Sequence, residues 1–272
     1  MKMPWNRWVG NSQKKGSQDS ARPQMTMPQL IAASVGALTL ALALSACQSI
    51  AKSYQYSLVR VIDASTNAPA LNVFVGGTEM AANIGDGTIT SYGTLPTSSA
   101  MAIVVKDATA TSTSTSSTLL STTTSIVTGA HYSLLVADSS TSTSSYTLSV
   151  LEDQHTAAAS GQSAFRFINE ATNTGAVDIY VVPSTTTLAK TAALETDLTV
   201  GTVTKYVSFA SQTVTIVIVP TGTTVTGTTA LTDEYTSSSL TLTGGEVRTV
   251  LIVDSKLTSA PTFTAVIADD MN

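Results

Sequence analysis

Few side chains in this sequence can do covalent chemistry: a single cysteine, Cys47, and two histidines, His131 and His155. The cysteine directly follows an apolar run of seventeen residues, Leu30–Ala46. Residues 1–29, which precede this run, carry five basic side chains and one acidic side chain. A basic segment, an apolar segment and small residues before a cleavage point are the parts of an export signal. The sequence therefore predicts an exported protein with its cysteine at the cleavage point.

The segment Leu44-Ser-Ala-Cys47 resembles the end of a bacterial lipoprotein signal peptide. The resemblance implies cleavage between Ala46 and Cys47, removal of residues 1–46, and acylation of the Cys47 thiol with palmitate-type chains. Two or more acyl chains hold a protein stably on a bilayer. By the same resemblance, Gln48 in place of aspartate implies sorting to the outer membrane, facing either the periplasm or the cell surface. The alternatives are an uncleaved transmembrane helix, since seventeen residues are at the lower limit for spanning, and a buried helix.

Composition limits the partners of the remaining chain. Without its first 46 residues the chain has 8 basic and 17 acidic residues, a net charge of about −9. Phosphate binding requires clustered Lys and Arg, so we exclude a nucleic-acid partner. Because Cys47 is the only cysteine, the fold cannot contain an internal disulfide. We expect the partners to be the membrane, through the lipid, and an envelope polysaccharide or protein.

Neither histidine is positioned for catalysis by its sequence context. His131 begins a predicted strand, His155 lies in a predicted linker, and no Gly-x-Ser-x-Gly turn is present to expose a serine nucleophile. Asp63, Ser65 and Asn67 could offer oxygen ligands to calcium, but no glutamate completes the set. A turn capped by the Asp63 side chain is the simpler interpretation. We therefore predict no catalytic residue, no metal site and no cofactor, and we expect that the protein is not an enzyme.

The chain after Cys47 contains an internal sequence repeat. Val59–Val75 and Phe165–Val181 are identical at six of seventeen positions. Two further matches follow in the same order, 87–95 with 201–209 and 129–138 with 245–254. We infer a duplication, with one copy at 52–153 and a second at 162–272, joined by a linker at 154–161.

Short runs of alternating apolar and polar residues recur about every ten residues in each copy, which is typical of β-strands. In the first strand, alternation places Val59 and Val61 on the core face and Arg60 on the other face. The matching residues of the second copy are Phe165, Phe167 and Arg166. We predict about seven short antiparallel strands per copy. The fold class is therefore all-β, with two tandem immunoglobulin-like or transthyretin-like sandwiches after the N-terminal signal helix.

Two pairs of aromatic residues and two apolar runs add detail. The pattern places Phe74 and its match Tyr180 outside the core, and Tyr92 and its match Tyr206 on the third strand. The nearly continuous apolar runs at 101–105 and 215–219 predict strands that are covered on both faces. The acidic pairs Glu152-Asp153 and Asp269-Asp270 predict a charged, unpaired last strand edge.

The opening motif of each copy resembles a family of bacterial extracellular repeats classified only as a domain of unknown function. Its usual sequence is hydrophobic-Arg-hydrophobic-hydrophobic-Asn/His-Ala-Ser-Pro-Asp-Ala-Pro, followed by a Val-Asp-Val-Tyr-Val strand. The first copy matches at Val59–Val75, with Thr66-Asn67 at Pro-Asp and Asn72 at the strand aspartate; the second copy keeps Asp178 and Tyr180. The resemblance implies a β-sandwich on a secreted or surface protein and implies no activity.

Ser- and Thr-rich stretches separate several predicted strands, at 108–125, 139–145 and 221–229. They are interpreted as polar loops on one rim of each sandwich, although alternating Thr and Ser could also lengthen the strands. We expect a non-enzymatic, lipid-anchored envelope protein with a structural or adhesive role. The alternative is a carbohydrate-binding surface lipoprotein that uses Phe74 and Tyr180, or Tyr92 and Tyr206, as sugar-stacking rings.

Overall fold

The computed structural model describes residues 55–110, 117–139, 145–226, 233–256 and 261–271. These residues are all-β, apart from one short 3-10 turn, η1 (Leu188–Lys190). Residues Tyr54–Asn272 form one compact unit. We refer to the strands before and after residues 154–161 as the N-terminal half and the C-terminal half.

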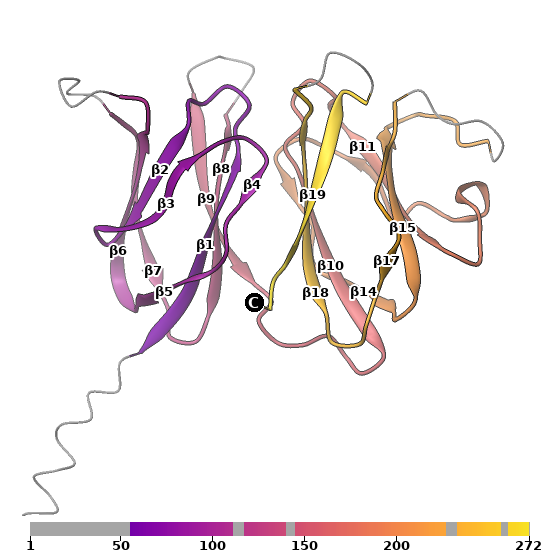
Figure 1. Ribbon diagram of the computed structural model, residues 1–272, viewed down its shortest axis with the longest axis horizontal. Helices are drawn as coiled ribbons and strands as arrows, with labels where there is room; N and C mark the ends of the chain where they lie inside the picture. The colour runs from indigo at the N-terminus through magenta and orange to yellow at the C-terminus, as the bar shows by residue number, and fades with distance from the viewer. Residues whose placement is uncertain (1–54, 111–116, 140–144, 227–232, 257–260, 272) are drawn as a thin grey trace, which may run out of the picture. The chain divides into compact units, whose positions relative to one another are not determined.

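The N-terminal half contains two sheets (Figure 1). Its strands are β1 (Tyr56–Ala64), β2 (Leu71–Val75), β3 (Thr78–Ile84), β4 (Thr88–Ile89), β5 (Gly93–Pro96), β6 (Ser98–Asp107), β7 (Thr118–Ile126), β8 (His131–Asp138) and β9 (Tyr146–Asp153). Sheet A has the order β4-β1-β8-β9, with β5 also paired to β1, and sheet B has the order β3-β2-β6-β7. Within sheet A, β1 and β8 are parallel, whereas the other neighbours are antiparallel.

The C-terminal half also contains two sheets. Its strands are β10 (Gln162–Asn169), β11 (Val177–Pro183), β12 (Glu195–Leu198), β13 (Thr202–Val203), β14 (Val207–Ala210), β15 (Thr213–Pro220), β16 (Tyr235–Thr236), β17 (Leu240–Thr241), β18 (Val247–Asp254) and β19 (Phe263–Asp269). Sheet C has the order β13-β10-β18-β19, with β14 on β10, and sheet D has the order β12-β11-β15-β16, with β17 on β15. The pairing of β10 with β18 is parallel, like that of β1 with β8.

An apolar core lies between the two sheets of each half. Val59 and Val61 of β1 pack with residues of β2, β6 and β8 in the N-terminal core. Phe165 and Phe167 of β10 occupy the matching place in the C-terminal core. All four side chains are fully buried, so the core faces predicted by alternation are confirmed.

A third apolar cluster joins the two halves. It combines Ile62 and Leu135 of sheet A with Ile168, Leu251 and Val253 of sheet C, all at most 3% exposed. These residues lie on the sheet faces that point away from the two cores. Sheets A and C are therefore each covered on both faces.

The strands expected to be covered on both faces differ between the halves. In β15, Val217 and Val219 are buried on the outer side of sheet D by Tyr180 and Leu188, so the prediction is correct there. In β6, Ala102 is exposed and Val104 is only half-buried, so the prediction is wrong there. The reason is the connection after the second strand of each half. Residues 184–194 include η1 and bring Leu188 over sheet D, whereas only two residues join β2 to β3.

That short turn consists of Gly76 and Gly77, with φ angles of 57° and 83°. Two successive positive φ values are the requirement of a tight two-residue hairpin turn, and glycine adopts them without steric cost. A Cβ atom on Gly76 would also meet the Met101 sulfur at 2.5 Å. The turn therefore leaves the outer face of sheet B without a covering segment among the described residues.

The Ser/Thr-rich stretch at 108–125 is only partly a connection. Its second part is strand β7, Thr118–Ile126, paired with β6. The interpretation of the whole stretch as a loop is therefore wrong, and the strand-lengthening alternative holds for 118–125. Thr and Ser fit this strand because most of it is exposed.

Candidate functional site

The predicted lipidation site lies outside the described residues. This applies to Cys47, to Ala46 and to the whole signal segment 1–46. Within the described part of the chain, no helix is long and apolar enough to cross a membrane. Cleavage and acylation therefore stay predictions from the sequence.

A buried polar network lies between sheets A and C, beside the third apolar cluster. The guanidinium of Arg60 donates through Nη2 to Asp270 Oδ1 at 2.6 Å and through Nε to Ser133 Oγ at 2.8 Å. Its Cζ atom lies 4.7 Å from the centre of the Tyr92 ring. Arg60 is 1% exposed. The predicted placement of this arginine opposite the core face is confirmed, and that face is the contact between the halves.

Arg166 repeats this arrangement in the opposite direction. Its Nη2 atom donates to Asp153 Oδ1 at 2.6 Å, and its Nε atom donates to Thr249 Oγ1 at 3.2 Å. The centre of the Tyr206 ring lies 4.9 Å from Cζ. Each arginine thus pairs with an aspartate of the other half, and the two halves contribute equivalent residues.

The two aspartates are held by their own half as well. Asp153 accepts a hydrogen bond from Tyr92 Oη at 2.6 Å and from Ser133 Oγ at 2.7 Å. Asp270 accepts from Tyr206 Oη at 2.6 Å and from Thr249 Oγ1 at 2.7 Å. Burial, together with the adjacent carboxylate, raises the pKa of each tyrosine above its usual value. The network therefore holds neutral phenols, carboxylates and guanidinium ions in fixed hydrogen bonds.

Two sequence predictions about this region are wrong. Asp153 and Asp270 are 2% and 0% exposed. They form buried ion pairs and do not place charge on an exposed, unpaired strand edge. Tyr92 lies between β4 and β5, not on a strand. The reason is Thr90, whose Oγ1 atom accepts the hydrogen bond from the Val61 amide at 2.9 Å, so that β1 pairs with two separate short strands. Thr204 makes the same bond to the Phe167 amide.

Acidic side chains gather where the described strands β1, β8 and β18 end. Asp63 Oδ1 accepts from the Ser65 amide at 3.0 Å, and Asn169 Oδ1 accepts from the Ala171 amide at 3.0 Å. The predicted turn capped by Asp63 is therefore confirmed, and Asn169 caps the equivalent turn of the C-terminal half. Asp138 and Asp254 bind the Asn67 and Asn173 amides in the equivalent loops.

Two of the carboxyls here have strongly perturbed pKa values. Burial raises the pKa of Asp63 to about 6 and that of Glu170 to about 7. Burial also raises the pKa values of Asp86 and Asp138. Within the described ranges, no three His, Cys, Asp or Glu residues are placed to hold a metal ion. The cluster is a largely buried acidic patch whose carboxyls are harder to ionise than free ones.

The two histidines lie together, which the sequence did not predict. Their ring centres are 5.2 Å apart, and His131 also lies 5.2 Å from the Tyr92 ring centre. Burial, followed by the neighbouring His155, lowers the pKa of His131. As predicted, His131 begins a strand, β8, and His155 lies between the strands of the two halves; His131 is half-buried and His155 is exposed.

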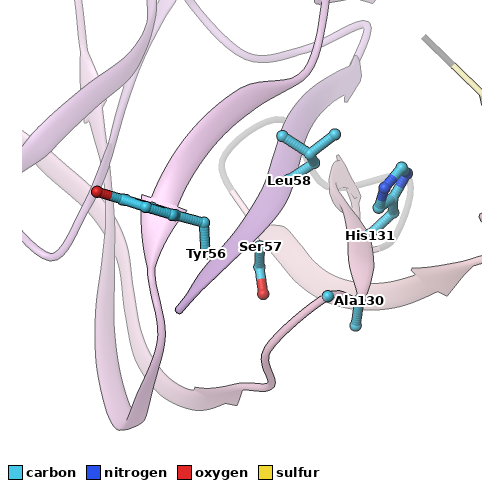
Figure 2. A pocket seen from close by; sticks show the side chains of 6 residues that line it. Tyr56, Ser57, Leu58, Ala130 and His131 are labelled. Atoms are coloured by element: carbon cyan, nitrogen blue, oxygen red, sulfur yellow. The ribbon is translucent and has the colours of Figure 1, made fainter. Parts of the chain in front are cut away.

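A shallow pocket of about 60 Å³ lies beside His131, where β1 begins. Figure 2 shows the Tyr56 side chain extending away from His131, with Ser57 and Ala130 between them. Ligand pockets usually have volumes of roughly 300–1,000 Å³. A pocket of this size has room for water but not for a substrate.

Sequence reasoning missed the role of Asn72 and Asp178. Asn72 Oδ1 accepts from the Asn83 amide at 2.7 Å, and Asp178 Oδ1 accepts from the Asp197 amide at 2.8 Å. Asn83 and Asp197 have φ angles of 51° and 55°, in the left-handed region. The equivalent positions of Asn72 and Asp178 in the repeat could have indicated a common structural role. They could not have indicated that each binds a left-handed residue of the neighbouring strand.

These motif residues can now be compared with known protein families. The model of a domain of unknown function, DUF4397, matches the chain from β1 into β11. Residues 57–180 contain a DUF4397 domain. The resemblance inferred from the opening motif is therefore confirmed to that extent. The DUF4397 match covers less than half of the chain, and it includes β10 and the first part of β11, which follow residues 154–161. No curated protein matches this chain.

Proposed function

We propose that this protein is a non-enzymatic, lipid-anchored protein of the bacterial cell envelope with a structural or adhesive role. Acylation at Cys47 after cleavage behind Ala46 attaches it to the outer membrane. Its two halves act as tandem immunoglobulin-like or transthyretin-like sandwiches, the first of which lies within the DUF4397 match.

The direction of the strands is the observation that carries the proposal. The chain enters at Tyr56, where β5 ends, because Tyr56 pairs with Pro96. Strands β6 and β8 run away from this end and finish at Asp107 and Asp138. The described residues that follow them, 108–110 and Ser139, are therefore at the opposite end of the sheets from Tyr56, where an envelope polysaccharide or protein can reach them.

The network between the halves supports a structural role. Its arginines donate to aspartates of the other half and its tyrosines donate to the same aspartates, so its polar side chains are engaged in holding the halves together. Such a network fixes the halves to each other.

Attachment can be tested with Cys47→Ser. The wild-type protein is expected to fractionate with outer membranes at the mass of an acylated chain that begins at Cys47. The Cys47→Ser variant is expected to lose the acyl mass, while Ser49→Ala, two residues along, should behave as wild type. A Cys47→Ser variant that remains in the membrane with the same mass as wild type would contradict the proposal. Protease digestion of intact cells then separates surface from periplasmic exposure.

The role can be tested in cells that lack the protein. Loss of the protein is expected to change adhesion or envelope permeability, and Cys47→Ser should fail to restore it. Turnover of an envelope substrate by the purified protein at enzyme-like rates would rule the proposal out.

Carbohydrate binding is the second candidate. One observation favours it: the half-buried Phe74 ring lies on the outer face of sheet B, 5.0 Å from the Lys106 ammonium. Tyr92 and Tyr206 are engaged in the network, and Tyr180 packs beside Leu188. A glycan array should therefore show binding that Phe74→Ala abolishes and Tyr180→Ala preserves. An empty array would remove this candidate.

A further inference from the structure

Two large apolar side chains are conspicuously exposed on the described surface, Tyr56 at 46% and Val127 at 57%. They lie on the same rim, because the Gly129 amide donates to the Tyr56 carbonyl at 2.9 Å and the Ser57 hydroxyl donates to the Val127 carbonyl. We call this surface the entry rim; it comprises Tyr56, the β5–β6 connection at Thr97 and the β7–β8 connection at 127–130.

The entry rim carries no charged residue. Charge is placed at the other end of the same strands, where Asp63, Asp86, Asp107 and Asp138 lie at or beside strand ends. The leaflets of bacterial membranes carry negative surface charge, which repels acidic groups and leaves uncharged ones unaffected. The rim itself is uncharged, and the exposed carboxylate nearest to it along β8 is Glu152, which pairs with Tyr132 one residue inside the strand. The rim can therefore approach a bilayer at a lower electrostatic cost than the opposite end.

The position of the lipid attachment brings this end to the membrane. Nine residues of chain lead from Cys47 to Tyr56, and a fully extended chain of that length reaches about 30 Å. The entry rim therefore stays within about 30 Å of the bilayer whatever path the tether takes. Tyrosine favours the headgroup layer, where its ring is apolar and its hydroxyl is hydrated.

We propose that the entry rim rests on the lipid headgroup layer, with Tyr56 and Val127 as the contacting side chains. This inference rests on the proposed acylation of Cys47. Two side chains alone bind a bilayer weakly, but a short tether supplies a high effective concentration, so a weak contact is enough to orient the molecule. The contact holds the acidic, Ser/Thr-rich end away from the membrane by the length of a strand, about 30 Å for the nine residues of β1.

A single introduced tryptophan tests the contact. Trp5 and Trp8 both precede Cys47, so the processed chain contains no tryptophan. Val127→Trp places one on the entry rim. Ser139→Trp is the matched control, since this exposed residue directly follows the last residue of β8. The eight residues of β8 span about 26 Å, so Ser139 lies about that distance from the entry rim. Each acylated variant is reconstituted in vesicles of phosphatidylethanolamine and phosphatidylglycerol, with and without brominated acyl chains.

The expected result is at least threefold stronger quenching by brominated lipid for Val127→Trp than for Ser139→Trp, together with a blue-shifted emission. Adding Tyr56→Ser to Val127→Trp should reduce this quenching by at least half. Equal quenching of both tryptophans, or none, would overturn the inference, as would a blue shift that requires an added protein partner. Mass spectrometry separates the two claims. A mature, acylated chain with equal quenching overturns the membrane contact alone, whereas an unacylated chain overturns the proposed function and the contact with it.

Discussion

Arg60 and Arg166 are buried charges, and the closest carboxylate of each comes from the other half of the chain. The guanidinium–carboxylate distances are both 2.6 Å, and the aspartates are 0% exposed at their side chains. Removing one partner of such a pair leaves an uncompensated buried charge, which costs roughly 3–5 kcal/mol. Exposed pairs contribute at most about 1 kcal/mol. Each arginine therefore contributes to stability chiefly because its ion pair is buried.

The first prediction compares two arginines of this chain. Arg60→Met should lower the free energy of unfolding by about 3–5 kcal/mol because it leaves the buried Asp270 carboxylate without its cationic partner. Arg248→Met is the matched control, because Arg248 pairs with Glu246 and both side chains are more than 20% exposed. Its loss should stay below about 1 kcal/mol. Urea unfolding of the processed chain, monitored by circular dichroism, measures both.

A second variant identifies the cause. If the stranded charge is responsible, Asp270→Asn added to Arg60→Met should recover part of the loss, because the double variant buries no lone charge. A double variant less stable than Arg60→Met would show that packing of the arginine, and not its charge, is what the interface needs.

At the scale of single elements, the second strand of each half supports a bulge in its neighbour. Asn72 in β2 binds the amide of Asn83 in β3, and Asp178 in β11 binds the amide of Asp197 in β12. The strand pairings shift register beside both bulges. The aspartate or asparagine of the opening motif therefore has a structural task, namely to hold the neighbouring strand in a left-handed conformation.

The second prediction concerns this bulge. Asn83→Gly should leave stability unchanged or raise it slightly, because glycine adopts a φ of 51° without strain. Asn83→Val should lower stability by more than about 1 kcal/mol, because a β-branched residue is strained there. Asn72→Ala should cost about 1 kcal/mol through the lost hydrogen bond. Thermal unfolding of the three variants gives the order, and equal effects of glycine and valine would contradict this account.

The sequence was informative about elements with regular alternation. It was uninformative where a single side chain takes the place of a backbone hydrogen-bond partner. Val59, Arg60 and Val61 alternate, so the faces of β1 could be predicted. Thr90 replaces a backbone partner with its hydroxyl, and no periodicity reports such a substitution. The network was missed for a further reason. Arg60 and Asp270 are 210 positions apart, and only the packing of the halves brings them together.

At the scale of the whole molecule, the contact between the halves has three parts: the Arg–Asp network, the apolar cluster and the acidic patch. In the patch, burial raises the pKa values of Asp86 and Asp138 of the N-terminal half, the charge of Asp254 adds to both shifts, and Lys256 opposes the shift at Asp86. Glu170 is likewise affected by Asp138. Ionisation of the patch therefore works against the contact.

The third prediction is a pH dependence of stability. The pKa of Asp63 rises from 3.8 to about 6 on folding, and that of Glu170 rises from 4.5 to about 7. At a pH between the unfolded-state and the folded-state pKa of each group, the folded state binds more protons than the unfolded state. The free energy of unfolding therefore falls as pH rises through this interval. The stabilisation is complete below about pH 4 and lost by about pH 7. Asp63→Asn with Glu170→Gln should flatten this slope and raise stability at pH 7 by an amount on the order of 2 kcal/mol.

The chain offers a precedent and a control for this double variant. Asn169 occupies the place of Asp63 in the C-terminal half and caps the same turn, so asparagine fits the backbone. Asp107 is the control, because hydrogen bonds from Thr109 lower its pKa. Its effect on stability therefore has the opposite pH dependence. The stabilisation by Asp107 is present at neutral pH and is lost as the pH falls below the usual pKa of aspartate. Asp107→Asn should therefore leave the slope between pH 4 and 7 unchanged. Urea unfolding at pH 4, 5.5 and 7 measures the slopes, and an equal slope in the double variant and the wild type would show that these carboxyls do not sense pH.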